Sequence, residues 1–237
     1  MPTAELTRKT VLLANVKGVS SRIAEACRRS GRDAASVKLL VVTKYAGDED
    51  VRILAEAGAL GLAGESRVQD ARARWTGRGP LAGLRKSVEL HFIGHLQTNK
   101  ARAAAEIFDW VDSVDSLKVA AELSRHAAAL GKRLPVLLQL RLNDSPTQSG
   151  IAPDAAPALL AEVRKLPGVE PRGYMGIAPE GASPAELSSV FLKAKTAFDR
   201  DFRGPGHYLS LGMSGDFEAA VEAGSNLPRL GGLVFGR

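Results

Sequence analysis

The chain has 237 residues, 45% of them hydrophobic and 24% charged, which suits one compact domain of the size common among α/β barrels. No apolar run approaches the ~18 residues that a membrane helix needs, and the N-terminal MPTAELTRKT lacks the apolar core of a signal peptide. We therefore expect a cytoplasmic protein that does not associate with membranes. The net charge of +6 is spread among acidic residues, a pattern typical of solvated helix faces and not of nucleic-acid binding.

The N-terminal residues and the longer amphipathic segments predict helices with recognisable ends. A long helix over Ala4–Ser30 comes first, and the pattern over Asp48–Ala57 stops at Gly58. A second clear case, Ser116–Leu130, opens on a helix-capping serine and stops before a glycine. Three more helices are predicted over Pro153–Lys165, Pro184–Arg200 and Asp216–Ala223.

Eight short apolar runs alternate with these helices and predict β-strands. Most are rich in Val, Leu or Ile, and several are apolar throughout, as in parallel strands buried on both faces. The predicted strands are Lys38–Thr43, Ala59–Ala63, Glu89–Ile93, Trp110–Ser113, Pro135–Leu142, Val169–Ile177, His207–Leu211 and Leu227–Leu230.

Alternating strands and helices indicate either a closed barrel or a doubly wound sheet. The barrel is favoured because the long first helix precedes strand one and can cover the wall that the short tail after strand eight leaves bare. We therefore expect a single domain over residues 1–237, a (β/α)8 TIM-type barrel with an extra N-terminal helix. In such a barrel, function lies at the carboxyl ends of the strands.

Lys44 directly follows the apolar run that predicts strand one. Apolar surroundings would desolvate its ammonium and lower its pKa, which favours the neutral amine that forms a Schiff base with a carbonyl. The alternative is a lysine that extends into solvent at the barrel rim. The local sequence does not separate these two interpretations.

Two glycine-containing strand ends suit a phosphate. Ser210–Asp216, with Gly212 and Ser214, leads into a helix start, where free N–H groups and a hydroxyl bind anions. Near the C-terminus, Gly231 and Gly232 follow Arg229 closely. The alternative for each is a tight turn with an ordinary helix cap. A Schiff-base lysine facing a phosphate cradle would indicate pyridoxal 5′-phosphate (PLP) or a phosphorylated aldehyde substrate.

Other candidate sites are weaker. His91 and His95 are four residues apart, but they lie at a strand end and in a loop, with no third metal ligand nearby. The single cysteine, Cys27, excludes an internal disulfide and an all-cysteine metal site. No G-x-S-x-G, H-E-x-x-H, Walker A or paired C-x-x-C pattern is present.

Several motifs together resemble one family over almost the whole chain. They are VVTK at 41–44, GES with VQ at 64–69, LHFIGHLQTNK at 90–100, SVDS at 113–116, QSGI at 148–151 and LSLGMSGDFEAAVEAGSNLPRLGG at 209–232. In order and spacing they are similar to those of the PLP homeostasis proteins (the YggS/PROSC group). That group is similar in fold to the barrel domain of bacterial alanine racemases.

The resemblance implies a PLP site. Lys44 matches the lysine that forms the Schiff base with PLP, and Arg229 matches the arginine that faces the pyridine nitrogen. An arginine keeps its proton, so that nitrogen would stay unprotonated and the cofactor would be a poor electron sink. Ser214, Gly231 and Gly232 match phosphate-binding positions. The set of cofactor-binding candidates is completed by Ser66, Met175 and Gly212, at the ends of strands two, six and seven.

This sequence departs from the family pattern at four positions. Ser66 stands where Asn is usual, Tyr45 where Thr is common, and Gln148 where Lys is frequent. Gly232 replaces the usual Thr or Ser and so removes one hydroxyl donor to the phosphate. We therefore expect this chain to retain the phosphate less tightly than a typical family member.

The resemblance implies a PLP carrier without established catalysis, which holds PLP for PLP-dependent apoenzymes and acts as a monomer. Racemases of similar fold take a second base from another domain, and no such base is evident here among Tyr45, Tyr174 and Tyr208. The alternatives are a PLP-dependent amino-acid racemase, a Schiff-base aldolase using Lys44, or a basic nucleic-acid-associated protein.

Overall fold

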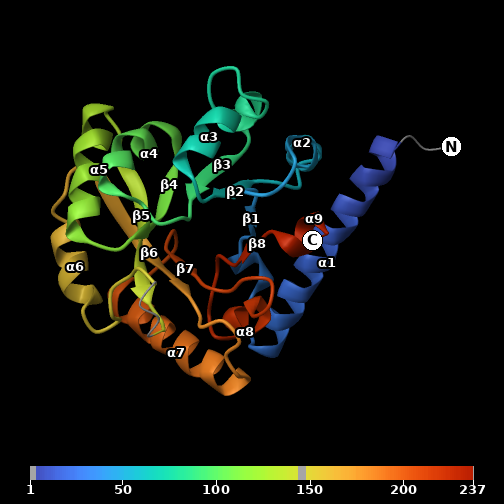
Figure 1. The fold of residues 1–237 in the computed structure, drawn as a ribbon. Coiled ribbons are helices and arrows are strands. Elements are labelled where there is room, and N and C mark those ends of the chain that lie inside the picture. The colour runs from blue at the N-terminus through green and yellow to red at the C-terminus, as the bar shows by residue number, and fades with distance from the viewer. Residues whose placement is uncertain (1–3, 144–147, 237) are drawn as a thin grey trace.

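A computed structural model describes residues 4–143 and 148–236 of the chain and shows eight parallel strands in a nearly closed barrel with flanking helices (Figure 1). This confirms the expected fold class. The strands pair in the order β7-β6-β5-β4-β3-β2-β1-β8. Their bounds are β1 Leu40–Val42, β2 Leu62–Glu65, β3 Glu89–Phe92, β4 Trp110–Val114, β5 Leu134–Arg141, β6 Val169–Ile177, β7 Tyr208–Ser210 and β8 Arg229–Leu230.

Among the described residues, β7 and β8 form no continuous strand ladder; side chains and two isolated backbone bonds join these ends of the sheet. The backbone bonds run from the Asn226 N–H to the Leu209 carbonyl and from the Arg229 N–H to the Gly212 carbonyl, both at 3.0 Å. Ser225 Oγ accepts the N–H of Leu211 at 3.1 Å and lies within hydrogen-bond distance of the carbonyls of Leu209 and Leu211, at 3.0 and 2.8 Å. Asn226 Oδ1 accepts the N–H of Leu209 at 2.7 Å. These bonds pair backbone N–H and carbonyl groups at the edge of β7 that would otherwise lack partners. They also hold β7 beside the segment that leads into β8.

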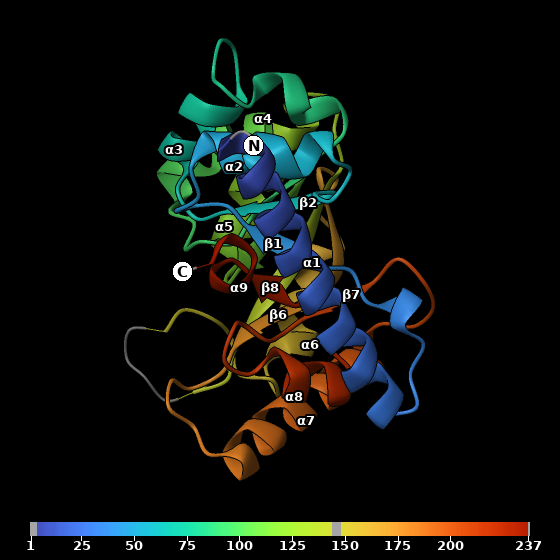
Figure 2. The same cartoon turned by 90° about the vertical axis from the view of Figure 1, so that its right-hand side faces the viewer.

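Helices cover the outside of the barrel. The long first helix, α1, crosses the region of β1 and β8 and packs against α2, α8 and α9, as Figure 2 shows. This is the placement expected for an extra N-terminal helix. The α-helices are α1 Ala4–Arg29, α2 Asp48–Glu56, α3 Val68–Trp75, α4 Ala101–Ile107, α5 Leu117–Ala129, α6 Ala156–Val163, α7 Pro184–Asp201, α8 Phe217–Glu222 and α9 Gly232–Phe235; short 3-10 helices are Ala34–Ser36, Ala82–Lys86 and Thr98–Lys100.

Some boundaries differ from the sequence-based expectation. Strand two begins at Leu62 and not at Ala59, because the chain first turns after α2 at Gly58, whose φ is +69°. The helix expected from Pro153 begins at Ala156. Helices α3, α4 and α9 were not predicted. They are short, and α3 carries charged residues at three of its eight positions and an amide at a fourth, so its apolar face is narrow.

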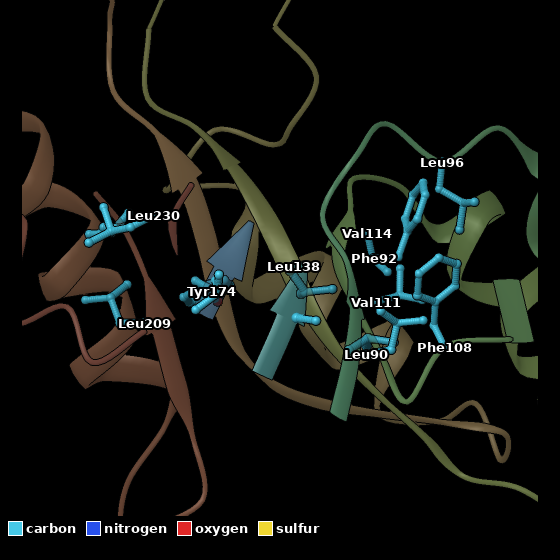
Figure 3. Packing of buried hydrophobic residues seen from close by; sticks show 14 of the residues in the cluster. Leu90, Phe92, Leu96, Phe108, Val111, Val114, Leu138, Tyr174, Leu209 and Leu230 are labelled. Carbon is cyan, nitrogen blue, oxygen red and sulfur yellow. The ribbon is translucent and has the colours of Figure 1, made fainter. Parts of the chain in front are cut away.

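Alternate residues along each strand face either the barrel interior or the helices. The interior cluster contains Leu40, Leu137, Met175 and Leu227, all at most 1% exposed. The larger outer cluster fills the space between sheet and helices, and Figure 3 shows Leu90, Phe92, Leu96, Phe108, Val111 and Val114 gathered at one part of it. In the described residues, no helix is both long and apolar enough to cross a membrane.

Candidate functional site

A cavity of about 290 Å³ opens at the carboxyl ends of the strands, near the lower end of the size range of small-molecule sites. Six of the sequence-predicted site residues line it, drawn from the ends of β1, β2 and β8 and the loop after β7: Lys44, Ser66, Ser214, Arg229, Gly231 and Gly232. The remaining wall comes from residues that the sequence reasoning did not select: Val42, Tyr45, Ala46, Ile93, Ile177, Met213 and Phe235.

Two predicted site residues, Met175 and Gly212, do not line the cavity. Met175 is 1% exposed and packs in the barrel interior, and Ile177, two residues further along the same strand, reaches the cavity instead. Gly212 has a φ of +93° and accepts the N–H of Arg229 through its carbonyl at 3.0 Å. A Cβ at Gly212 would lie 2.7 Å from the Cα of Phe217, so this glycine permits a close backbone approach.

Lys44 extends from the loop after β1, because the strand itself ends at Val42. Its side chain is exposed, and Nζ lies 5.0 Å from the ring centroid of Tyr45. Of the two interpretations that the sequence left open, desolvation of this ammonium by the buried strand does not agree with the exposed side chain. Lys44 instead stands at the rim of the cavity, the alternative that the sequence left open.

Arg229 places a buried cation in the cavity wall. Its Nη1 donates to the carbonyl of Ser210 at 2.7 Å and to Ser210 Oγ at 2.9 Å, and Nη2 donates to the carbonyl of Gly176 at 2.9 Å. All three acceptors are neutral, and in the described parts of the chain no carboxylate lies within ion-pair distance. Burial lowers the pKa of Arg229 to about 10, so the guanidinium remains charged at neutral pH.

A buried cation without a carboxylate partner is costly unless further acceptors compensate for lost hydration. Arg229 is 5% exposed and lines the cavity. A ligand that presents an acceptor atom to this guanidinium would therefore gain a charge-assisted hydrogen bond. The arginine fits a ligand with a neutral ring nitrogen or an oxygen at this end.

Other parts of the lining provide backbone and hydroxyl groups suited to an anion. Ser214 lies in the loop that leads into α8, and Gly231 and Gly232 connect β8 to α9, where the first helical N–H groups have no partner within the helix. The loop before α8 is closed by the Met213 N–H, which donates to Asp216 Oδ1 at 2.6 Å. A Cβ at Gly231 would lie 2.9 Å from the carbonyl oxygen of Val42, so glycine allows β8 to end against β1.

A second buried charged group lies in the barrel interior. His91 Nδ1 is 3.0 Å from both carboxylate oxygens of Asp112, Nε2 is 3.2 Å from Glu89 Oε1, and the imidazole stacks on Trp110 with ring centroids 5.3 Å apart. Burial opposes its charge, but Asp112 and Glu89 outweigh that and raise the pKa of His91 to about 9. Among the described residues, no group of three or more His, Cys, Asp or Glu is placed to hold a metal ion.

Comparison with known proteins decides the family. The chain matches the family described as "Alanine racemase, N-terminal domain" over residues 19–237. It is also 38% identical over 231 residues to the pyridoxal phosphate homeostasis protein of Pseudomonas aeruginosa, with 94% of each chain covered. The chain belongs to the pyridoxal phosphate homeostasis protein family. The resemblance seen in the sequence motifs is thereby confirmed.

Solved structures agree with this assignment to the family. PipY of Synechococcus elongatus, in a structure with PLP bound, is 35% identical to this chain and superimposes with a TM-score of 0.74, covering 92% of this chain and all of that one. An alanine racemase from Clostridium difficile has a TM-score of 0.72 and covers 98% of this chain but 57% of its own. At 14% identity, the racemase shows the shared barrel fold alone.

Proposed function

We propose that this chain binds PLP, holds it as a Schiff base on Lys44 and serves intracellular PLP homeostasis by delivering it to apoenzymes. The observation that carries the proposal is the cavity itself. It brings Lys44, the buried cation of Arg229 and the loop of Ser214 together at one end of the barrel. The PLP-bound structure of PipY, a relative of the same fold, supports the choice of ligand.

The residues present fit the chemical parts of PLP. Ser214, Gly231 and Gly232 would hold the phosphate through backbone N–H groups and one hydroxyl, Arg229 would face the ring nitrogen, and Lys44 would meet the aldehyde. When bound, PLP supplies an electrophilic aldehyde on an electron-withdrawing ring. The apolar side chains of the wall, among them Ile177, would exclude water from the ring.

Arg229 also favours a carrier over an enzyme. With a pKa of about 10, the guanidinium keeps its proton at neutral pH and can only donate to a ring nitrogen. An unprotonated ring nitrogen withdraws electrons weakly, which disfavours the carbanion chemistry of a racemase. Tyr174 is unsuited as a second base, because its hydroxyl donates to Asp201 on the outer side of the barrel at 2.6 Å.

Absorbance spectroscopy of the purified protein tests the Schiff base directly. Added PLP should give the visible band of a lysine Schiff base in the wild-type chain, and the Lys44→Ala variant should lack it. Lys100→Ala is the matched control, because Lys100 does not line the cavity. An equal band in wild type and Lys44→Ala, or no band at saturating PLP in either, would refute the proposed linkage.

Activity assays separate the carrier from its enzymatic alternatives. A racemase would interconvert alanine enantiomers above the Lys44→Ala background, and an aldolase would turn over a sugar phosphate without PLP. We expect neither. Transfer would appear as activation of a PLP-dependent apoenzyme by the loaded protein faster than the spontaneous release of PLP into buffer allows.

A further inference from the structure

The backbone on either side of Lys44 is held by one arginine from α3. Arg74 Nη1 donates to the carbonyl of Thr43 at 2.9 Å, and Arg74 Nη2 donates to the carbonyl of Ala46 at 3.0 Å. The guanidinium therefore spans the two-residue segment Lys44–Tyr45 from outside the barrel. No signal in the sequence around Arg74 points to this role.

The guanidinium is itself fixed by two carboxylates. Arg74 Nη1 lies 2.7 Å from Glu65 Oε1, and Arg74 Nε lies 2.6 Å from Asp48 Oδ1 at the start of α2. Glu65 is fully buried, and the same Oε1 accepts the hydroxyl of Thr43 at 2.8 Å and the indole N–H of Trp75 at 3.1 Å. The Arg74 side chain is 14% exposed. This arrangement ties the end of β1 to the end of β2, to the start of α2 and to the end of α3.

The side chains of the held segment lie outside the hydrophobic core. Lys44 is exposed and Tyr45 is 68% exposed, so neither is fixed by packing in the core. The backbone bonds of the segment are the turn from the Ala46 N–H to the Thr43 carbonyl at 3.0 Å and the Thr43 N–H to the Gly64 carbonyl at 3.0 Å. The two bonds from Arg74 add to these and hold the carbonyls on both sides of Lys44, so they contribute to the direction in which Lys44 leaves the backbone.

We propose that Arg74 is a positioning residue that sets how readily Lys44 reaches the ligand aldehyde, and so controls covalent retention separately from phosphate binding. The inference rests on the proposed function, since it assumes the Schiff base on Lys44. Arg74 touches neither the cavity nor the ligand position, and it acts through the backbone of Thr43 and Ala46. The phosphate loops at Ser214 and Gly231 follow β7 and β8, and the four hydrogen bonds of Arg74 go to other residues.

An arginine is suited to this role where a lysine is not. Its planar guanidinium has five N–H donors in fixed directions, and here they serve two carbonyls and two carboxylates at once. A lysine keeps the positive charge beside buried Glu65 but offers one ammonium at a single point. Arg74→Lys therefore removes the simultaneous hydrogen bonds to the two carbonyls but keeps a positive charge beside the buried carboxylate of Glu65.

The test compares two ligands that differ only at the reactive group. PLP carries the aldehyde, whereas pyridoxamine 5′-phosphate carries an amine there and cannot form a Schiff base with Lys44. Arg74→Lys should weaken PLP binding by about tenfold and reduce the Schiff-base band, while leaving the affinity for pyridoxamine 5′-phosphate within about twofold. The double variant Arg74→Met with Glu65→Gln, which removes both charges, should behave in the same way.

Arg72→Lys is the matched control, because Arg72 lies on the same helix, pairs with Glu106 on the surface and is 54% exposed. It should change neither affinity. An unchanged PLP affinity in both Arg74 variants would overturn the inference, and so would an equal loss for both ligands, which would mean a general loss of structure. A wild-type chain that binds PLP without the band would overturn the proposed Schiff base and this inference with it.

Discussion

The imidazole of His91 lies 3.0 Å from both carboxylate oxygens of Asp112 inside the barrel, and neither side chain is exposed to solvent. A buried charge of this kind depends on its charged partners, here Asp112 and, at 3.2 Å, Glu89. Asp112 also acts at longer range on Arg229, where its charge opposes the lowering of the arginine's pKa by burial. The interior of the barrel thus carries charges of alternating sign, from Glu89 through His91 and Asp112 to Arg229 in the cavity wall.

Stability should depend on pH through His91. Its pKa in the folded chain is about 9, above the ordinary value of 6.5, so the folded state binds the proton more tightly than the unfolded state. The free energy of unfolding should therefore be highest below about pH 6.5 and fall by about 3 kcal/mol as the pH rises through 9. Urea unfolding across this range measures the slope.

The matched comparison uses His91→Gln and His95→Gln. The first should flatten the pH dependence between about pH 6.5 and 9 and lower stability at neutral pH, because Asp112 would lose its partner. His95 is 58% exposed, so its replacement should leave the slope unchanged. Equal slopes in wild type and His91→Gln would contradict the assignment of the charge.

The seam between β7 and β8 should limit both stability and ligand affinity. Ser225→Ala removes the hydroxyl that serves the N–H of Leu211 and the carbonyls of Leu209 and Leu211. The Leu209 carbonyl keeps its bond from the Asn226 N–H, but the Leu211 N–H loses its acceptor, which should cost about 1–3 kcal/mol in the free energy of unfolding, measured with urea. PLP affinity should fall as well, because the loop of Ser214 and the end of β8 lie on either side of the seam.

Ser87→Ala provides the control for this substitution, since Ser87 is exposed and its hydroxyl donates to one local carbonyl, that of Leu84. It should change the free energy of unfolding by less than about 0.5 kcal/mol. A Ser225→Ala variant as stable as Ser87→Ala would show that the barrel does not depend on this side-chain closure.

The barrel could be predicted from the sequence because its strands are buried on both faces and so read as apolar runs. The position of Lys44 just after strand one could be predicted from the apolar run that precedes it. Its exposure could not, because the strand ends at Val42 and only the fold shows where the next loop turns. Helix α4 has an alanine-rich sequence with little amphipathic contrast, so the sequence pattern did not predict it.

Residues that line the cavity were predicted from the sequence where motifs mark the strand ends. They were missed where the choice depends on how far along a strand the cavity begins. Met175 and Ile177 lie on the same face of β6, two residues apart. Met175 packs in the barrel interior, whereas Ile177 lines the cavity. The spacing of residues in the sequence does not show how deep into the barrel the cavity extends. Arg74 was missed because its partners, Thr43, Glu65 and Ala46, come from two other strand ends.

Arg229→Gln should weaken PLP binding by about tenfold or more, because a neutral amide replaces a charge-assisted donor at the ring nitrogen. The amide can still donate to one of the carbonyls that Arg229 now serves, which limits the structural loss. Arg203→Gln, at an exposed position outside the cavity, is the control and should bind PLP as wild type does. Titration of the Schiff-base band gives both affinities, and equal values would contradict the role of Arg229.

Gly232→Thr should strengthen retention of the phosphate. Gly232 lines the cavity at the first position of α9, where a threonine hydroxyl would add one donor to an anion already facing backbone N–H groups. One added hydrogen bond to a charged group corresponds to about a tenfold gain in affinity. Gly232→Val has nearly the same shape without the hydroxyl, so the difference between the two variants isolates that donor. Dissociation constants for inorganic phosphate and for PLP measure it, and a valine variant that binds as tightly as the threonine variant would mean that the hydroxyl contributes nothing.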